Sequence, residues 1–157
     1  MSFEPIWDEN SRIRILGTYP SPKSREQGFY YGHPKNRFWK LLAALLECPI
    51  PTDIPQKKQM LLSHKIAIWD VCDSCAIEGA ADASIRDVIP NDIASFLRKT
   101  GITEVFCNGA KAYELYQKHI GAQCGITVYK MPSTSPANAA SSMEKLQDAW
   151  RILQKFL

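Results

Sequence analysis

The order of elements in this sequence predicts an α/β protein, a three-layer α/β/α sandwich around a mainly parallel sheet of about four strands. Two observations support this prediction. Short apolar segments alternate along the chain with longer amphipathic ones, and each apolar segment is followed by a polar or irregular stretch. Such alternation is typical of strand–helix units, which place successive strands side by side and parallel.

The four predicted strands are apolar segments bounded by turn-forming residues. They cover residues 12–17 (RIRILG), 65–71 (KIAIWDV), 102–107 (ITEVFC) and 126–131 (ITVYKM). The first alternates apolar and basic residues and ends in glycine. The second is almost continuously apolar, as in strands that are covered on both faces.

The predicted helices lie between and after these strands. Asn36 is a candidate N-cap for RFWKLLAALLE, whose apolar residues form one stripe at helical spacing. A short helix is expected in QKKQMLLSH, and further helices at 91–100 and 110–120. Ser141-Ser-Met-Glu144 fits a capping box for a final helix.

Three segments lack a clear period: residues 18–35, 72–83 and 132–140. Each follows the carboxyl end of a predicted strand. The carboxyl ends of parallel strands lie at one edge of the sheet, which is where such folds bind ligands. We therefore expect the three loops to meet in one cleft, and we expect the long first loop to be functional.

Composition restricts the class of protein. The chain has 157 residues, 45% hydrophobic and 22% charged, and we expect one domain over residues 1–157. The net charge of +3 permits a polyanionic partner through a local basic patch but does not demand one. No apolar run is long enough to span a membrane, and no secretory signal is recognisable. These features exclude disordered, fibrous and membrane-spanning classes.

The five cysteines are predicted to be reduced thiols of a cytoplasmic protein, because their number is odd and no secretory signal is present. Cys72 and Cys75 form a CxxC pair, but one such pair is a weak zinc signal and does not clearly open a thioredoxin-like helix. We therefore favour structural thiols over a metal or redox role. The histidines show no ligand spacing, so no metal is expected.

Polar residues that could form a site lie in or beside each loop. The amide of Asn36 either caps the next helix or lines a site, and the sequence leaves both open. Asp70 ends an apolar strand, where a carboxylate is costly unless it meets a partner, a ligand or nearby backbone amides. Segment 131–139 (MPSTSPANA) either binds phosphates through its hydroxyl groups or is an ordinary turn.

These loops, in this order, resemble the uracil DNA glycosylase superfamily over most of the chain, from Ile15 to the last helix. HPKNRFWKLL is similar to the segment after motif 1 of the mismatch-specific (thymine/uracil) glycosylases. The combination of FYYGHPKNRFW, WDVCDSC and MPSTSPANA resembles the hypoxanthine DNA glycosylase (DNA-deoxyinosine glycosylase) branch more closely. The resemblance implies a monofunctional DNA glycosylase of base excision repair that hydrolyses the N-glycosidic bond of a flipped deaminated base, above all hypoxanthine, without metal or cofactor.

One motif departs from the mismatch-specific pattern. Those enzymes carry Gly-x-Asn-Pro, whose Asn serves the catalytic water, whereas this chain has Gly17-Thr18-Tyr19-Pro20. A phenol does not simply replace an amide that orients water, so this motif does not predict efficient uracil excision of the ordinary type. The hypoxanthine branch similarly lacks that Asn, and the resemblance assigns the catalytic role to the Asn of HPxN, here Asn36, with Asn108 as a second candidate.

The resemblance also implies roles for other loop residues. Tyr31 matches the stacking aromatic of the family, and Asp70 stands where the superfamily often places a base-reading side chain. The implied base-binding set is Tyr31, Asp70, Asn108, Thr18 and Tyr19. The implied DNA-contacting set is Pro132, Ser133, Thr134, Ser135, Lys35 and Arg37. The expected partner is DNA containing deaminated bases, with no membrane, and we expect a monomer whose DNA affinity is moderate and salt-sensitive.

Alternative functions stay open. A uracil-preferring glycosylase would differ in base choice alone, because an Asp70 acceptor would also accept uracil N3–H. A non-catalytic module would bind damaged DNA and leave no abasic product. A redox protein would require a low pKa at Cys72 or Cys75. Excision from inosine- and uracil-containing oligonucleotides separates the first alternative, and the abasic product separates the second.

Overall fold

Four parallel strands form the central sheet in the computed structural model, which describes residues 3–78 and 81–157. The strands are β1 (Ile13–Gly17), β2 (Ile66–Asp70), β5 (Glu104–Asn108) and β6 (Thr127–Met131), in the order β2-β1-β5-β6. Each neighbouring pair is parallel, and Gly17 at the end of β1 is in register with Asp70 at the end of β2. The predicted parallel sheet is confirmed, with strand bounds shifted by one or two residues.

Burial explains the apolar character of these strands. Every residue of β1 and β2 is buried, whereas β6 at the edge buries only Met131. The edge of β2 is covered by the N-terminal segment, where Ile6 and Ile68 exchange two backbone hydrogen bonds of 3.0 Å. This cover protects an edge that would otherwise present unpaired backbone groups.

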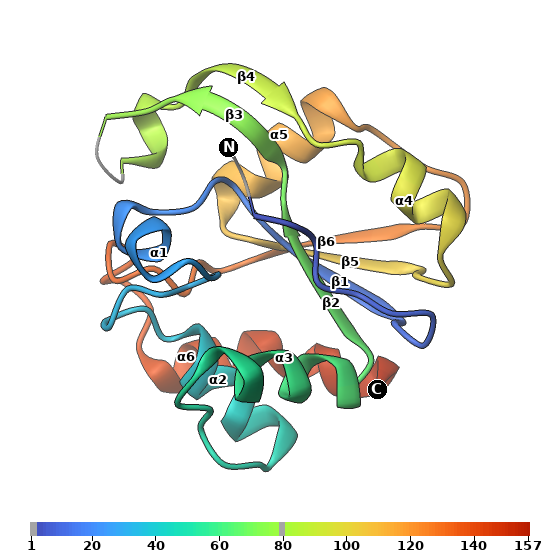
Figure 1. The fold of residues 1–157 in the computed structure, drawn as a ribbon. Coiled ribbons are helices and arrows are strands. Elements are labelled where there is room, and N and C mark those ends of the chain that lie inside the picture. Colours follow the sequence, from blue (N-terminus) through green and yellow to red (C-terminus); the bar gives the residue numbers. More distant parts are fainter. Residues whose placement is uncertain (1–2, 79–80) are drawn as a thin grey trace.

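Helices form a layer on each face of the sheet (Figure 1). Helices α2 (Phe38–Leu46), α3 (Ile54–Ser63) and α6 (Met143–Trp150) cover one face, and α4 (Ile93–Lys99) and α5 (Ala110–His119) cover the other. Helix α2 contacts α6 on the first face, and α5 packs on β5 and β6 on the second. Short 3₁₀ segments occupy Asp82–Ser84 and Arg151–Phe156. The arrangement confirms the predicted three-layer α/β/α sandwich.

The prediction that residues 72–83 are irregular is wrong for their first half. Strand β3 (Cys72–Ala76) pairs antiparallel with β4 (Arg86–Pro90), a strand that the sequence analysis did not predict. Two register shifts interrupt this ladder, and most residues of β4 are exposed. A strand that buries little side-chain surface has no apolar alternation, so no period of two marks it in the sequence.

The first loop is also more ordered than predicted, because residues 18–35 include helix α1 (Pro22–Gln27). Ser21 caps this helix by accepting from the backbone N–H of Ser24, and Pro22 opens it. Helix termini elsewhere shift slightly. The helix expected at 91–100 begins at Ile93, after the N-cap Asp92.

Two predicted caps are displaced by one residue. The N-cap of α6 is Ser142, which accepts from the N–H of Lys145 at 3.2 Å, so the capping box predicted for Ser141 is wrong. The N-cap position of α2 is Arg37 rather than Asn36. Asn36 still accepts the N–H of Phe38 through Oδ1 at 3.0 Å, so its side chain does bond the helix start.

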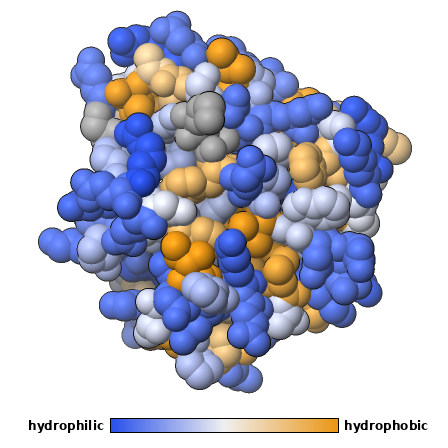
Figure 2. Space-filling view, in the orientation of Figure 1, coloured by the Kyte–Doolittle hydropathy of each residue, from blue (hydrophilic) through white to orange (hydrophobic). Residues whose placement is uncertain are grey.

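The surface and the core divide as expected for this class of fold. Buried apolar residues from both helix layers and the sheet form one cluster. The face seen in Figure 2 shows hydrophilic side chains around small groups of hydrophobic ones. Within the described residues, none of the helices has the length and apolar character required to cross a membrane.

Candidate active site

The loops that follow β1, β2 and β6 meet at the carboxyl edge of the sheet around a cavity of about 110 Å³. The end of β5 completes the wall. This confirms the cleft expected from the loop positions. The predicted site residues that line the cavity are Thr18, Tyr19, Tyr31, Asn36, Asp70, Asn108, Ser133, Thr134 and Ser135.

Three predicted DNA-contacting residues lie outside the cavity lining. The carbonyl of Pro132 accepts from Trp150 Nε1 at 3.0 Å, and the side chain of Lys35 is exposed. The guanidinium of Arg37 donates to the carbonyls of Ser135 and Asn138 in the third loop and to that of Ser141 directly after it. Arg37 therefore fixes the third loop to the start of α2.

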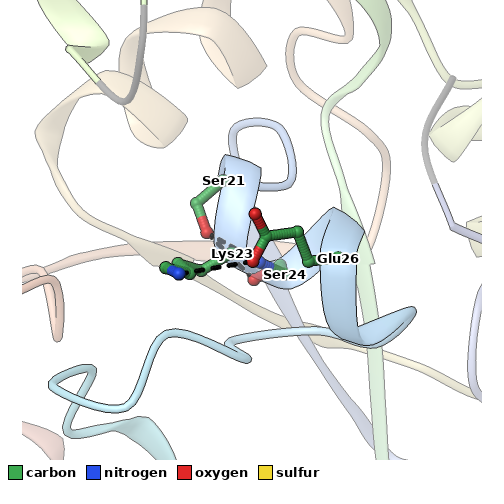
Figure 3. A network of polar contacts seen from close by, with 4 residues as sticks. All are labelled: Ser21, Lys23, Ser24 and Glu26. Atoms are coloured by element: carbon green, nitrogen blue, oxygen red, sulfur yellow. Dashed lines mark hydrogen bonds and ion pairs between the residues drawn. The ribbon is translucent and has the colours of Figure 1, made fainter.

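Ser24 is a site residue that the sequence analysis missed. It is 3% exposed, lines the cavity and accepts the N–H of Gly32 through Oγ at 2.9 Å. Ser21 Oγ donates to the same oxygen, and Lys23 pairs with Glu26 on the outer side of the helix (Figure 3). The helix that carries Ser24 could have been found from Ser21 and Pro22, because a serine followed by a proline is typical of an N-cap and a first helical residue.

Other cavity residues missed by the sequence analysis come from distant parts of the chain. Phe3 lies in the N-terminal segment, and Ile77 and Asp82 follow β3. Asp82 Oδ1 accepts from Thr18 Oγ1 at 3.5 Å, which links this segment to the turn after β1. No local pattern marks these residues, because the sheet topology alone brings them to the cavity.

Tyr31 is held in an unusual conformation beside the cavity. Its φ is +53°, in the left-handed region that non-glycine residues rarely adopt. Its ring stacks on Phe38, with centroids 4.0 Å apart, so one ring face is covered. Burial raises the pKa of its phenol, and the charge of Asp70 raises it further. The neighbouring Asn108 amide opposes these effects, yet among the described residues Oη meets no partner at hydrogen-bonding geometry.

Asp70 is a carboxyl group buried at the end of β2. It is 4% exposed, and burial raises its pKa to about 7. Its main-chain carbonyl accepts from Asn91 Nδ2 at 2.8 Å, but in the described part of the chain its Oδ2 has no hydrogen-bond partner. An unpaired buried carboxyl oxygen is costly, so its retention here is consistent with a ligand-binding role.

Asp70 and Tyr31 both approach the Cα of Gly17. A Cβ at that position would lie 2.5 Å from Asp70 Oδ1 and 3.0 Å from Tyr31 Oη. Glycine is therefore required for space rather than for backbone conformation. The end of β1 thus brings a buried acceptor and a buried hydroxyl to one corner of the cavity.

Another part of the cavity wall consists of three hydrogen-bonded side chains, those of Asn36, Asn108 and Thr134. Thr134 donates its N–H to Asn108 Oδ1 at 3.0 Å, and Asn108 Nδ2 donates to Thr134 Oγ1 at 3.0 Å. Thr134 Oγ1 in turn donates to Asn36 Oδ1 at 2.8 Å. These bonds join β5, the third loop and the start of α2. Thr134 is fully buried, so the wall is fixed by paired groups.

The thiols near the cavity do not have the properties of a redox pair. Burial raises the pKa of Cys72 to about 12, and burial also raises the pKa of Cys75. A reactive thiol needs the opposite shift. Within residues 3–78 and 81–157, no group of three or more metal-ligating side chains is present that could hold a metal ion.

Comparison with protein families agrees with the fold. The model of the uracil DNA glycosylase superfamily matches residues 5–157. The chain therefore belongs to the uracil DNA glycosylase superfamily, as the resemblance of its loops implied.

Two relatives and one solved structure refine this assignment. The chain is 33% identical to a hypoxanthine DNA glycosylase of Methanosarcina acetivorans, with 96% of this chain and 95% of that protein covered. It is 32% identical to a hypoxanthine DNA glycosylase of Methanosarcina barkeri, with 94% and 93% covered. It also matches the solution NMR structure of a Methanosarcina acetivorans protein named as a candidate uracil DNA glycosylase. That match has a TM-score of 0.79 at 29% identity and covers 98% of this chain and 97% of that one.

Proposed function

We propose that this protein is a monofunctional DNA glycosylase that removes hypoxanthine from DNA in base excision repair. The observation that carries the proposal is the buried, unpartnered carboxyl oxygen of Asp70 in the cavity. The chain is similar over nearly its whole length to two proteins named hypoxanthine DNA glycosylase. Five free cysteines fit a reducing compartment, so we place the activity in the cytoplasm.

The base-recognition step uses the corner formed by Asp70 and Tyr31. A glycosylase extrudes its target nucleotide at a cost of a few kcal/mol, and stacking on an aromatic ring recovers roughly 1–3 kcal/mol. Hypoxanthine carries N1–H, which Asp70 accepts in its ionised form, the form that prevails above a pKa of about 7. Adenine has an unprotonated N1, which would face the carboxylate acceptor to acceptor. Tyr31 supplies the stacking surface, since Phe38 covers only one of its faces.

The chemical step breaks the bond between C1′ and N9 of the base. The electron pair of that bond leaves with the base, and the backbone amides of the turn at residues 18–21 stabilise the developing negative charge. A water molecule oriented by Asn36 forms the new bond to C1′, and its proton ends on the released base. The products are an abasic site and free hypoxanthine, so no cofactor or metal takes part.

The third loop and the basic residues near it contact the DNA backbone. Ser133, Thr134 and Ser135 present a stiff segment beside the cavity, where Ser133 and Ser135 can meet the phosphates that flank an extruded nucleotide. Lys35 is exposed next to this segment and adds a screened, salt-dependent attraction.

The test is an alkali-cleavage assay on duplex and single-stranded oligonucleotides that contain inosine, uracil, xanthine or only normal bases. We expect cleavage at inosine by the wild type and a loss of orders of magnitude in the single-turnover rate for Asn36→Ala. Asn10→Ala, the same change at an exposed position, is the matched control and should behave as wild type.

Three outcomes would contradict the proposal in different ways. Cleavage at uracil alone would identify a uracil-preferring enzyme, since Asp70 could also accept uracil N3–H. Binding without an abasic product would identify a non-catalytic module. Near-normal excision by Asn36→Ala would reduce Asn36 to a helix-start residue worth about 1 kcal/mol of stability.

A further inference from the structure

The amide of Asn36 is oriented by a chain of hydrogen bonds whose last link comes from Thr134, 98 residues away in the sequence. Asn108 Nδ2 donates to Thr134 Oγ1, and Thr134 Oγ1 donates to Asn36 Oδ1. The two distances are 3.0 Å and 2.8 Å. Thr134 is therefore the link between the end of β5 and the first loop.

The direction of this chain is fixed by a backbone N–H at each end. The N–H of Thr134 can only donate, so the Asn108 atom that it meets at 3.0 Å must be the oxygen. The nitrogen of that amide then faces Thr134 Oγ1 and donates to it. A threonine hydroxyl has one proton, and with its oxygen already accepting, that proton is free to bond Asn36.

The other end of the chain requires the same orientation. The N–H of Phe38 can only donate, and it meets the Asn36 side chain at 3.0 Å. The same Asn36 atom receives the Thr134 proton, so it is Oδ1. An Asn36 amide turned by 180° would place its NH₂ group against the Phe38 N–H, donor against donor. The assignment of oxygen and nitrogen, which is normally inferred, is here forced from both ends.

This orientation decides what Asn36 offers to the cavity. Its oxygen is used twice within the protein, and its Nδ2 has no partner in the described part of the chain. Asn36 lines the cavity, so its free group there is a donor with two N–H bonds. A donor binds a lone pair of water and fixes the direction of the other lone pair, but it cannot accept the proton of that water.

We propose that Thr134 is a positioning residue that holds Asn36 as a hydrogen-bond donor toward the attacking water. The inference rests on the proposed glycosylase function and adds the polarity of the Asn36 contact and the residue that sets it. Removing the Thr134 hydroxyl leaves Asn108 Nδ2 without its acceptor and removes one of the two donors that hold Asn36 Oδ1, so that the Phe38 N–H alone positions the amide. The backbone bonds of Thr134 to Asn108 Oδ1 and to the N–H of Arg37 remain.

The first experiment compares Thr134→Val, which keeps the shape, with Thr134→Ser, which keeps the hydroxyl. Single-turnover excision at saturating inosine DNA should fall about tenfold to a hundredfold in Thr134→Val, the cost of one unmade buried hydrogen bond. Thr134→Ser should stay near wild type, and the Kd for DNA should change little in either. Equal rates in folded wild type and Thr134→Val would overturn the proposal.

The second experiment tests the polarity itself. Asn36→Asp is isosteric but replaces the donor with an acceptor, so it should lose as much activity as Asn36→Ala. If Asn36→Asp instead retains or gains activity, Asn36 acts as a proton acceptor and the proposal is wrong.

A third measurement keeps the proposal testable if no base is excised. The ¹H–¹⁵N resonances of the Asn36 side-chain amide, assigned by their loss in Asn36→Ala, should shift in Thr134→Val and stay in place in Thr134→Ser. Absence of excision together with this shift would refute the glycosylase function while leaving the positioning contact intact. Absence of the shift would refute the positioning contact itself.

Discussion

The two walls of the cavity differ in how their polar atoms are satisfied. In the wall of Asn36, Thr134 and Asn108, the contacts between side chains are closed hydrogen bonds. In the corner of Asp70 and Tyr31, a carboxyl oxygen and a phenol oxygen are buried without partners among the described residues. The first wall is organised before a ligand arrives, whereas the second has hydrogen-bonding capacity that only a ligand would use.

The two regions should contribute to the free energy of unfolding with opposite signs. Closed bonds in the first wall contribute stability, so their removal should destabilise the fold. Unpaired atoms in the second corner cost stability, so their removal should stabilise the fold and harm recognition. Function and stability are thus expected to change in the same direction at one wall and in opposite directions at the other.

The largest effect should be the pH dependence caused by Asp70. Its pKa is raised to about 7 by burial, so between about pH 4 and pH 7 the folded state binds more protons than the unfolded state. The free energy of unfolding should therefore fall as pH rises through this window, by up to about 4 kcal/mol, and level off above it. Urea unfolding from pH 4 to 8 measures this, and Asp70→Asn should remove that component. An unchanged pH profile in Asp70→Asn would show that the carboxyl costs nothing.

Base choice should change next most strongly. Asp70→Ala should lower the preference for inosine over adenine by about tenfold to a hundredfold, because an unsatisfied buried acceptor pair costs about 1–3 kcal/mol. The measurement is the ratio of excision rates on matched oligonucleotides. Asp148→Ala removes an exposed carboxyl and should leave the ratio as it is. If Asp70→Ala keeps the ratio, base reading lies elsewhere, and Asn108 is the next candidate.

Asn108→Ala tests the closed wall. It removes the acceptor of the Thr134 N–H and the donor to its hydroxyl, so the fold should lose about 1–3 kcal/mol. Asp70→Asn, measured beside it at pH 8, should show no loss or a gain. A destabilised Asp70→Asn with an unaffected Asn108→Ala would reverse the comparison, which urea titration would reveal.

The smallest effect concerns two neighbouring basic residues, one bonded within the protein and the other exposed to solvent. Arg37 is bonded to carbonyls of the third loop, whereas Lys35 is exposed. Lys35→Ala should flatten the slope of log affinity against log salt by roughly 0.9 on duplex DNA, with stability unchanged. Arg37→Ala should mainly lower stability. Equal slopes for wild type and Lys35→Ala would make Lys35 an ordinary solvated side chain.

The sheet was predictable because its signals are local. The run from Ile66 to Trp69 is apolar, since both faces of β2 are covered, and the order of strands and loops placed the cleft. The hairpin of β3 and β4 was missed because it packs little surface and contains register shifts. Helix α1 was missed because a six-residue helix has too few turns for a period.

Only some of the residues that line the candidate site, and none of the contacts between them, were predictable from the sequence. Asn36 and Asp70 drew attention because an amide and a carboxylate stand beside apolar segments. The role of Thr134 could not be foreseen, because its partners lie 26 and 98 residues away and a hydroxyl in MPSTSPANA has no preferred partner. The hydrogen-bond partners of a loop hydroxyl depend on how the strands and loops are arranged in space, which a single sequence does not reveal.

The absence of a side chain at Gly17 leaves the space that Asp70 and Tyr31 occupy. A Cβ there would lie 2.5 Å from Asp70 Oδ1 and 3.0 Å from Tyr31 Oη, so the glycine can change only if the Asp70 carboxyl is removed and the Tyr31 hydroxyl shifts slightly. Substitutions of Gly17 should therefore be epistatic with Asp70: a side chain at Gly17 is tolerated only where the carboxyl is absent, whereas Asp70 can change alone. A family member that abandoned the carboxyl could then admit alanine at this strand end and acquire a narrower cavity for a different base.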